Sequence, residues 1–432
     1  MRTAHPAAIA LLAASVISCE SESAVDESSS ARDSAGVTIV ENTRPAWRAG
    51  DSWLVPETAR VTTGVIGGDP AYELFRPRAA FRLSDGRLVI ANTGTQQVRY
   101  YDESGRHIMS VGGRGGGPGE FRRIDRVFRV QDDSVVVYDQ TQRRITVFDP
   151  DGNHVRDVSL ALRDQNFFPL INGRFPDGSY IGSLRLRREN DELPTGLVRD
   201  SLLVLRFDVA GELLDTLGVF HNRVMDVQTR SIGSNSFRGP AEVALSPRTV
   251  WTVSDNRILV GTSDRYEIRA YKDGGTMDWI VRKHHMPIPV TDRDREQLVQ
   301  AWRDIWYDRL DNPEIQYVLH TLEESPLPKA FPAFDPQVLD DRGWRIGESL
   351  LSDPDNNLWV AEYRPPGSDV SPRWSVFDVS GRWLGEITLP NGFTLMDVGS
   401  DYVIGLWSDD LGVESIRLHD VMKPGTTDEL GA

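Results

Sequence analysis

Cysteine, regularly spaced histidine and long apolar runs are scarce in this chain, and each shortage excludes a class of site. Cys19 is the only cysteine among 432 residues, so the folded body has no internal disulfide, cysteine-based zinc site or thiol nucleophile. The eight histidines never follow the H-x-x-x-H spacing of zinc ligands. Beyond the N-terminus, no apolar run approaches the roughly 20 residues of a membrane-spanning helix, which predicts a soluble body.

Motifs of nucleophilic and carboxylate catalysis are also missing. No G-x-S-x-G elbow is present to place a serine nucleophile. Asp353–Asn357 lacks the spacing and the terminal Glu of an EF-hand calcium loop. Three adjacent acidic pairs fall in predicted turns, where neighbouring side chains diverge into solvent: Asp132/Asp133, Asp340/Asp341 and Asp409/Asp410. The sequence therefore predicts no catalytic residue, metal ligand or cofactor, although a structural calcium ion stays open, and it favours a protein that is not an enzyme.

Positive charge is in deficit. The chain has 48 Lys and Arg against 64 Asp and Glu, a formal net charge of −16. A field of this sign repels polyanions, so no nucleic-acid partner is expected. The basic clusters Arg122–Arg123 and Arg185–Arg188 are local.

The N-terminus reads as an export signal. Arg2 is followed by an almost wholly apolar run, Ala7–Ile17, which ends at Ser18-Cys19. This ending resembles the bacterial lipobox, and the resemblance implies cleavage of residues 1–18 and lipidation of Cys19. The chain would then be exported and lipid-anchored in the cell envelope, facing the periplasm, with the membrane as a partner. Glu20 in place of the Asp associated with inner-membrane retention favours the outer membrane. The alternative is an ordinary export signal with an incidental cysteine.

One unit recurs along the rest of the chain. It has three β runs, the third ending in aromatic-Asp-x-x-Gly, and its clearest copies end at Gly105 and Gly152, 47 residues apart. Weaker copies reach Gly211, Gly274, Gly381 and Leu418, which makes six. Each unit is too small to be stable alone, so stacking around an axis is expected, with the aromatic residue packed between blades and the Asp capping the turn.

A Gly-rich segment, Val111–Phe121, links two of these units. Neither a helix nor a Lys-Ser/Thr pair follows it, which argues against a phosphate loop. The segment resembles the blade junction of NHL-repeat propellers. With its six units, the chain is similar to six-bladed β-propeller lipoproteins of bacteria. The resemblance implies that residues 36–424 form an all-β, six-bladed propeller that carries a small helical insertion. A disordered tether is expected before it at 19–35, and a flexible tail after it at 425–432.

Both ends of the repeat region fit together. A degraded junction, Val65–Phe75, implies that Arg60–Ile66 is an outer strand with no blade before it, while the last unit stops after its third strand. We therefore predict that Arg60–Ile66 completes the last blade, which removes an open sheet edge. Gly36–Asn42 is a further β run that could add an outer strand. The tether would leave from near this closure.

Residues 286–343 break the repeat with a predicted helical hairpin. Thr291 can cap Asp292–Leu310 with Asp294 at the capping-box position, and Asn312-Pro313 starts a second helix. An apolar stripe runs along the first helix: Leu298, Ala301, Trp302, Ile305, Trp306 and Leu310. The stripe either packs over a blade edge or the channel end, or forms a lid with Trp302, Trp306 and Tyr307 partly exposed over a binding site. Both can hold.

The propeller face built from the junctions and from the turns between second and third strands is the candidate binding surface. Its predicted members are Arg76, Arg78, Asn92, Arg122, Arg123, Asp139 and Arg143, together with Trp302, Trp306 and Tyr307 of the insertion. The leading hypothesis is a monomeric, membrane-tethered, non-catalytic binding or scaffolding module for a protein or small ligand. The alternative is a metal-dependent hydrolase or lyase at the axial channel, as the gluconolactonase-like propeller enzymes would imply.

Overall fold

The computed structural model describes residues 28–130, 132–160, 169–186, 193–232, 235–336, 347–365, 368, 370–409 and 412–424. The predictions for the signal peptide 1–18, for Cys19 and for the tail 425–432 lie outside the described residues. Within them, no helix is long and apolar enough to cross a membrane.

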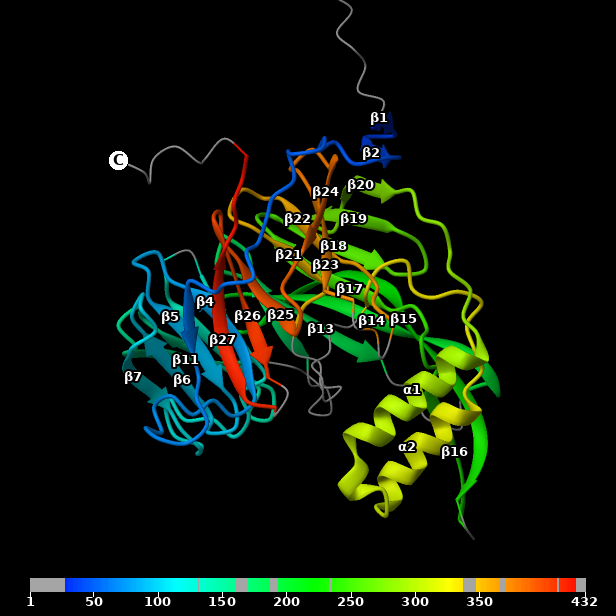
Figure 1. Ribbon diagram of the computed structural model, residues 1–432, viewed down its shortest axis with the longest axis horizontal. Coiled ribbons are helices and arrows are strands. Elements are labelled where there is room, and N and C mark those ends of the chain that lie inside the picture. The colour runs from blue at the N-terminus through cyan, green and yellow to red at the C-terminus, as the bar shows by residue number, and fades with distance from the viewer. Residues whose placement is uncertain are drawn as a thin grey trace, which may run out of the picture.

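Six sheets stand around one axis (Figure 1), and together they form a six-bladed β-propeller, as predicted. Their innermost strands touch one another in a closed ring, β4–β8–β12–β17–β21–β25 and back to β4. Strands are given from the axis outward. The first blade has β4 (Pro77–Arg82), β5 (Leu88–Asn92), β6 (Gln97–Tyr101) and β7 (His107–Gly112), the second has β8 (Arg126–Arg129), β9 (Val135–Asp139), β10 (Arg144–Phe148) and β11 (His154–Ser159), and the third has β12 (Leu170–Arg174), β13 (Tyr180–Leu186), β14 (Gly196–Phe207), β15 (Leu213–Ile232) and β16 (Asn235–Glu242). The fourth blade has β17 (Thr249–Ser254), β18 (Arg257–Thr262), β19 (Glu267–Lys272) and β20 (Met277–Lys283), the fifth has β21 (Leu350–Ser352), β22 (Leu358–Ala361), β23 (Arg373–Phe377) and β24 (Trp383–Thr388), and the sixth has β25 (Phe393–Val398), β26 (Tyr402–Ser408) and β27 (Glu414–Asp420).

The repeated turn explains why the blades stack. Asp102 Oδ1 accepts hydrogen bonds from the backbone N–H groups of Ser104 and Arg106 at 3.0 and 2.9 Å, which confirms the predicted cap. The turn glycine that follows has a positive φ, 88° at Gly211, and a Cβ there would lie 2.4 Å from the carbonyl oxygen of Ser159 in the preceding blade. Glycine is therefore required both by the turn and by the contact between blades.

The aromatic residue that precedes each turn Asp packs between blades, also as predicted. Tyr101 joins an apolar cluster with Ile416 and Leu418 of the last blade, and Phe377 joins one with Val281 of the blade before it. Both aromatic side chains are fully buried. The burial of large rings such as Tyr101 and Phe377 between blades supplies apolar contact that holds the ring of blades closed.

The N-terminal region closes the ring. β3 (Val61–Thr63) pairs antiparallel with β27, with Val61 opposite Leu418 and Thr63 opposite Ile416. The prediction that Arg60–Ile66 completes the last blade is confirmed, although only three of these residues form the strand.

The start of the described chain lies elsewhere than expected. β2 (Val37–Asn42) pairs parallel with β20, which confirms the added outer strand but places it on the fourth blade, away from the closure. β1 (Ser29–Ser34) pairs with β2, so the prediction of a tether reaching residue 35 is wrong for these six residues. A chain that reverses at Ala35-Gly36, both with positive φ, can make this hairpin although its residues are polar.

Residues 43–60 then run along the outer edge of the fifth blade to the sixth. The backbone N–H groups of Ala46 and Trp47 donate to the carbonyl oxygens of Trp383 and Leu384 at 2.9 and 2.8 Å. We call this segment the strap. It carries the chain from the fourth blade to the closure, which corrects the prediction that the tether leaves beside the closure.

The insertion is a helical hairpin made of α1 (Asp292–Ile305), a short 3-10 turn, η2 (Tyr307–Arg309), and α2 (Pro313–Glu324). The two predicted helix starts are confirmed: the N–H of Thr291 donates to Asp294 Oδ2, and Asn312 Oδ1 accepts from the N–H of Glu314, each at 2.8 Å. The first helix ends before Leu310, which is exposed.

The apolar stripe of the insertion meets the partner helix rather than a blade. Its cluster is built from Val299, Ile315 and Leu319, with Trp302, Trp306 and Leu322 packed against it. The prediction that the stripe packs over a blade edge or the channel end is therefore wrong, because the apolar faces of α1 and α2 pack against each other. Val299, which was not assigned to the stripe, is the buried residue of α1.

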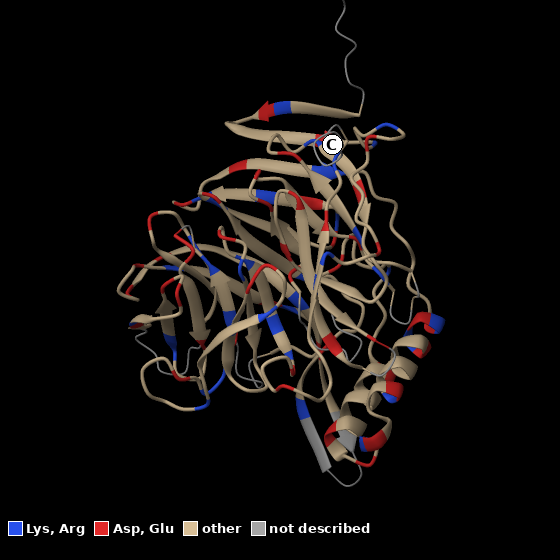
Figure 2. Ribbon diagram, turned by 60° about the vertical axis from the view of Figure 1, so that its left-hand side comes forward, with Lys and Arg blue, Asp and Glu red and all other residues tan. Residues whose placement is uncertain are grey.

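A second departure from the repeat, not predicted, comes from the third blade. β14 and β15 are 12 and 20 residues long, and β16 folds back along the extended part of β15. We call the extended parts of β14 and β15, with β16, the arm. The arm and the insertion project on the same side of the propeller, whereas β1 lies at the opposite end of the molecule (Figures 1 and 2).

Candidate functional site

The insertion and β16 lie between the last strand of one blade and the first strand of the next, and the extended part of β14 lies at the start of a third strand. They therefore belong to the same face as the predicted binding residues, which lie in the junctions or in turns between second and third strands. We call it the junction face. It contains the two longest additions that follow the first strand of the ring, the arm and the insertion.

Two predicted members of the junction face lie beneath it. Asn92 and Asp139 end the second strands of their blades and are fully buried. Asn92 Oδ1 accepts from the N–H of Phe75 at 2.7 Å, and Asp139 Oδ2 accepts from the N–H groups of Arg122 and Arg123 at 2.7 and 3.0 Å. Both side chains hold a junction in place, which corrects their predicted position on the surface.

The predicted arginines are distributed across the face. Arg122 and Arg123 are exposed, and Arg123 Nε lies 2.8 Å from Asp125 Oδ1. Arg76 has a φ of 55°, and its N–H donates to Glu414 Oε2 at 2.9 Å. Arg143, with a φ of 51°, is half-buried.

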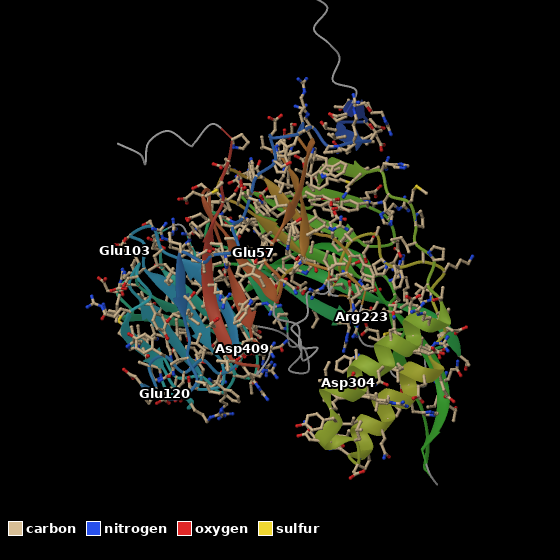
Figure 3. All side chains as sticks on the ribbon, viewed as in Figure 1. Glu57, Glu103, Glu120, Arg223, Asp304 and Asp409 are labelled. Atoms are coloured by element: carbon tan, nitrogen blue, oxygen red, sulfur yellow. The ribbon has the colours of Figure 1, made fainter. Side chains whose placement is uncertain are left out.

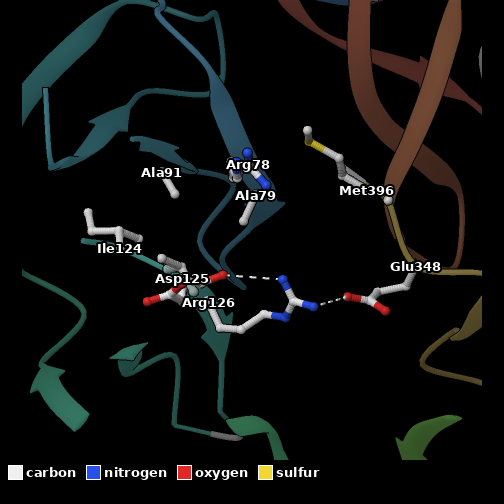
Figure 4. A pocket seen from close by; sticks show the side chains of 10 residues that line it. Arg78, Ala79, Ala91, Ile124, Asp125, Arg126, Glu348 and Met396 are labelled. Atoms are coloured by element: carbon white, nitrogen blue, oxygen red, sulfur yellow. Dashed lines mark hydrogen bonds and ion pairs between the residues drawn. The ribbon is translucent and has the colours of Figure 1, made fainter. Parts of the chain in front are cut away.

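Arg78 is brought to the mouth of the axial channel, where a cavity of about 90 Å³ opens (Figure 4). The charged residues of the lining are Arg78, Asp125, Arg126 and Glu348, and the apolar ones are Ala79, Ala91, Ile124, Val127 and Met396, with Gly347 completing it. We call this cavity the channel mouth. Three of its four charged residues were not predicted, because nothing local distinguishes a charge beside a channel from one in a solvated turn.

An ion pair crosses the channel mouth. Arg126 Nη2 lies 3.3 Å from Glu348 Oε1, and Arg126 Nη1 donates to the backbone carbonyl of Asp125 at 3.2 Å (Figure 4). The carboxylate of Asp125 is engaged elsewhere: besides Arg123, it accepts from the N–H of Gln140 at 2.8 Å. Burial raises the pKa of Asp125, and these donors oppose the shift.

Other polar groups lie on the inner strands. Ser254 Oγ and Ser352 Oγ, on neighbouring inner strands, lie 2.8 Å apart. Asp397 lies on β25, and its Oδ2 is shielded from solvent without a hydrogen-bond partner among the described residues. No three His, Cys, Asp or Glu side chains of the described residues are placed to hold one metal ion.

Burial raises the pKa of Asp397 to about 6, against the attraction of Arg129. A carboxyl that keeps its proton to higher pH when folded favours the folded state below about pH 4, and this contribution is lost as the pH rises through about 6. Asp397→Asn is therefore expected to raise the free energy of unfolding by about 2 kcal/mol near pH 7.5 and to change it little near pH 4. Urea unfolding at both pH values measures this, and an equal gain at both would contradict the titration.

The aromatic residues of the insertion divide into two environments. The rings of Trp302 and Trp306 are half-buried and in contact, with centroids 4.4 Å apart and planes inclined by 39°. Tyr307, at the tip of the hairpin, is 77% exposed. Of the three, Tyr307 is therefore the side chain most available to a partner.

Ion pairs fasten the base of the arm to the blade. Arg223, labelled in Figure 3, lies on β15, 3.2 Å from Asp200 Oδ2 and 2.8 Å from Glu242 Oε2. Arg248 pairs with the other oxygen of Glu242. Burial, followed by the neighbouring Glu242, raises the pKa of Asp200 to about 6 even though the N–H of Arg223 opposes it. Three strands joined in this way give the arm a fixed base.

Comparisons with known proteins agree with the fold. A family model described as DUF5128, 6-bladed beta-propeller, matches residues 79–210. The match covers the first two blades and part of the third. No curated protein sequence matches the chain.

Solved structures resemble the chain at low identity. A protein from Bacteroides fragilis shares 12% identity over 89% of this chain and 99% of that one, with a TM-score of 0.47. A member of the duf4221 family from Bacteroides vulgatus shares 10% over 86% and 99%, with a TM-score of 0.48. A gluconolactonase from Xanthomonas campestris shares 14% over 80% and 85%, with a TM-score of 0.36. None of these similarities carries a function to this chain.

Proposed function

We propose that this protein is an NHL-like propeller lipoprotein, exported and anchored by Cys19, that binds a protein or small ligand through its junction face without catalysing a reaction. The observation that carries the proposal is the position of the arm and the insertion. Both are additions to the blade repeat, both lie on the junction face, and β1 lies at the opposite end of the molecule. Two large additions that gather on one face indicate where a propeller scaffold has been adapted to a partner.

The anchor supports the same orientation. Cys19 precedes Ser28, the first described residue, by nine positions, and an extended chain of that length reaches about 30 Å. A membrane anchor at that distance holds the β1 end of the molecule near the bilayer. The junction face then points away from the membrane, where an arriving partner can meet Tyr307 and the arginines of the junctions.

Cys19→Ser is expected to move the protein from the membrane fraction to the soluble periplasmic fraction of a Gram-negative host, because the thioether-linked lipid is lost. Metabolic labelling with a clickable fatty acid should mark the wild type and leave the variant unmarked. Cys19→Ser is isosteric, and residue 19 lies outside the propeller, so folding provides no alternative explanation. Label on the serine variant would contradict the lipid anchor.

Photo-crosslinking tests the face. A photoreactive phenylalanine in place of Tyr307 is expected to give one crosslinked species of defined mass in cells. The double substitution Arg122→Ala and Arg123→Ala is expected to lower the yield of that species by about tenfold or more. The control position is Val155, which is 56% exposed on the outer strand of the second blade. Equal crosslinking from Val155, or none from Tyr307, would contradict binding at the junction face.

A further inference from the structure

A second cavity, of about 280 Å³, lies where the ring of blades closes. The N-terminal segment, the last blade and the first blade all contribute to its lining: Arg60, Val61, Arg82, Gly86, Leu88, Glu103 and Leu418. We call this cavity the closure pocket. Gly86 lies in the turn between β4 and β5, and Glu103 lies in the turn between β6 and β7. The closure pocket is therefore on the face opposite the junction face.

Arg82 places a guanidinium group in the closure pocket. It is the last residue of β4, it is half-buried, and its guanidinium lies 5.5 Å from the ring centre of Tyr402. Its Nε donates to the carbonyl oxygen of Gly86 at 3.4 Å, and its two Nη atoms have no acceptor within the part of the chain that the structure describes. A guanidinium in this state can hold a carboxylate in two parallel hydrogen bonds.

Glu103 places a carboxylate in the same pocket. Its side chain is exposed (Figure 3), and among the described residues the carboxylate has no hydrogen-bond or ion-pair partner. A Cβ added at Gly86 would lie 3.3 Å from Nη2 of Arg82 and 3.6 Å from Oε2 of Glu103. The two opposite charges therefore flank one glycine without forming an ion pair with each other.

The rest of the lining is aliphatic apart from a second arginine. Val61, Leu88 and Leu418 form the aliphatic wall. The guanidinium of Arg60 is already paired, since its Nη1 lies 2.7 Å from Oδ1 of Asp420. The closure pocket therefore offers a ligand one cation, one anion and an aliphatic surface.

We propose that the closure pocket binds an α-amino acid with an aliphatic side chain. Arg82 holds the ligand carboxylate, Glu103 holds its ammonium group, and the side chain lies against the aliphatic wall. A simple anion is repelled by Glu103 and a simple cation by Arg82, whereas a zwitterion matches both charges. A cavity of about 280 Å³ holds a molecule of this size. This inference goes beyond the proposed function and does not rest on it, because the two concern opposite faces.

Isothermal titration calorimetry of the purified full-length protein with L-leucine tests the proposal. Saturable binding with a Kd on the order of 0.1 mM is expected. Two analogues, 4-methylpentanoate without the ammonium group and 3-methylbutylamine without the carboxylate, should each bind at least about tenfold more weakly. Glycine should also bind more weakly than leucine, because it has no side chain to bury against the aliphatic wall.

Glu103→Gln distinguishes a site for a zwitterion from a site for any anion. This variant should bind leucine about tenfold more weakly than the wild type and 4-methylpentanoate more tightly, because a repelling carboxylate has been removed. Arg82→Gln should abolish the binding of leucine. The matched control is Glu212→Gln, an exposed glutamate in the corresponding turn of the third blade, which should bind leucine as the wild type does.

Two results would overturn the inference: wild-type protein that binds no leucine up to about 10 mM, or Glu103→Gln that binds leucine as tightly as the wild type. Because the side chain of Glu103 is exposed, its substitution leaves the fold intact and the test holds even where Arg82→Gln unfolds. The crosslink from Tyr307 reports on the junction face, so it bears on neither result.

Discussion

Replacing Lys283 by methionine should lower the free energy of unfolding by about 3–5 kcal/mol, one of the largest effects of a single substitution in this protein. Lys283 ends β20, and only 7% of its side chain is exposed. Its Nζ donates to Glu362 Oε1 and Ser375 Oγ, each at 2.8 Å, and to Glu386 Oε1 at 3.0 Å. Methionine keeps the length of the side chain, but it takes the cation from Glu362 and leaves Glu386 with Arg373 as its cationic partner, between the fourth and fifth blades.

Aromatic residues enclose this ammonium group and exclude the water that could replace it. Nζ lies 4.7 Å from the ring centre of Tyr266 and 4.3 Å from that of Trp383, and the Tyr266 hydroxyl donates to Glu362 Oε1 at 2.7 Å. Cation–π contacts in such a desolvated place strengthen the dependence on the charge.

Urea unfolding followed by tryptophan fluorescence measures the loss at Lys283. The matched control is Lys272→Met, at the end of β19, where the side chain is 59% exposed and pairs with Asp278; a change under about 1 kcal/mol is expected. Equal losses for the two variants would show that the buried network is not the cause.

Local physics explains which parts of the fold were predictable. The aromatic-Asp-x-x-Gly turn needs a short acceptor and a residue tolerant of positive φ at fixed spacing, so the same letters recur at Asp102–Gly105 and Asp208–Gly211. The two helix starts were predictable from Thr291 and Asn312, because a helix cap depends on residues only two or three positions apart. Closure by β3 followed from counting strands in an array that leaves no free edge.

The rest depends on contacts between distant residues. Arg126 and Glu348 are 222 positions apart, and neither is preceded by a pattern that differs from a solvated turn. The arm reads as ordinary β sequence, because strand propensity does not say where a strand passes the rim of its blade. The stripe of α1 was visible, but its partner, α2 or a blade, was not.

Asn92 and Asp139 show a subtler limit. A polar residue at the end of a buried strand can face solvent as a ligand contact or turn inward to accept backbone N–H groups, and the two cases have the same sequence. Here both turn inward, and the donors hold the pKa of Asp139 below its usual range although burial opposes this. A polar residue at a junction is therefore weak evidence for binding in this fold.

A chain that starts at Gly64 should lose most of its stability, whereas one that starts at Gly36 should keep it. The longer truncation removes β2, β3 and the strap. β27 then loses its partner strand, and the cluster of Trp359 loses Val55 together with the packed rings of Trp47 and Trp53. The loss should approach the roughly 5–15 kcal/mol that holds a typical domain folded.

The shorter truncation is the matched control, because it removes β1, whose residues from Ser30 to Ser34 are exposed, and leaves β2 on the fourth blade. Thermal unfolding by circular dichroism and gel filtration compare the two with the chain that starts at Ser28. The Gly64 chain should unfold without a sharp transition and associate through the bare edge of β27, since an uncovered strand pairs with any other. A melting temperature within a few degrees of the Ser28 chain would mean instead that the blades hold together without the N-terminal closure, and that the strap and β3 serve only to direct the anchor to the end of the molecule opposite the junction face.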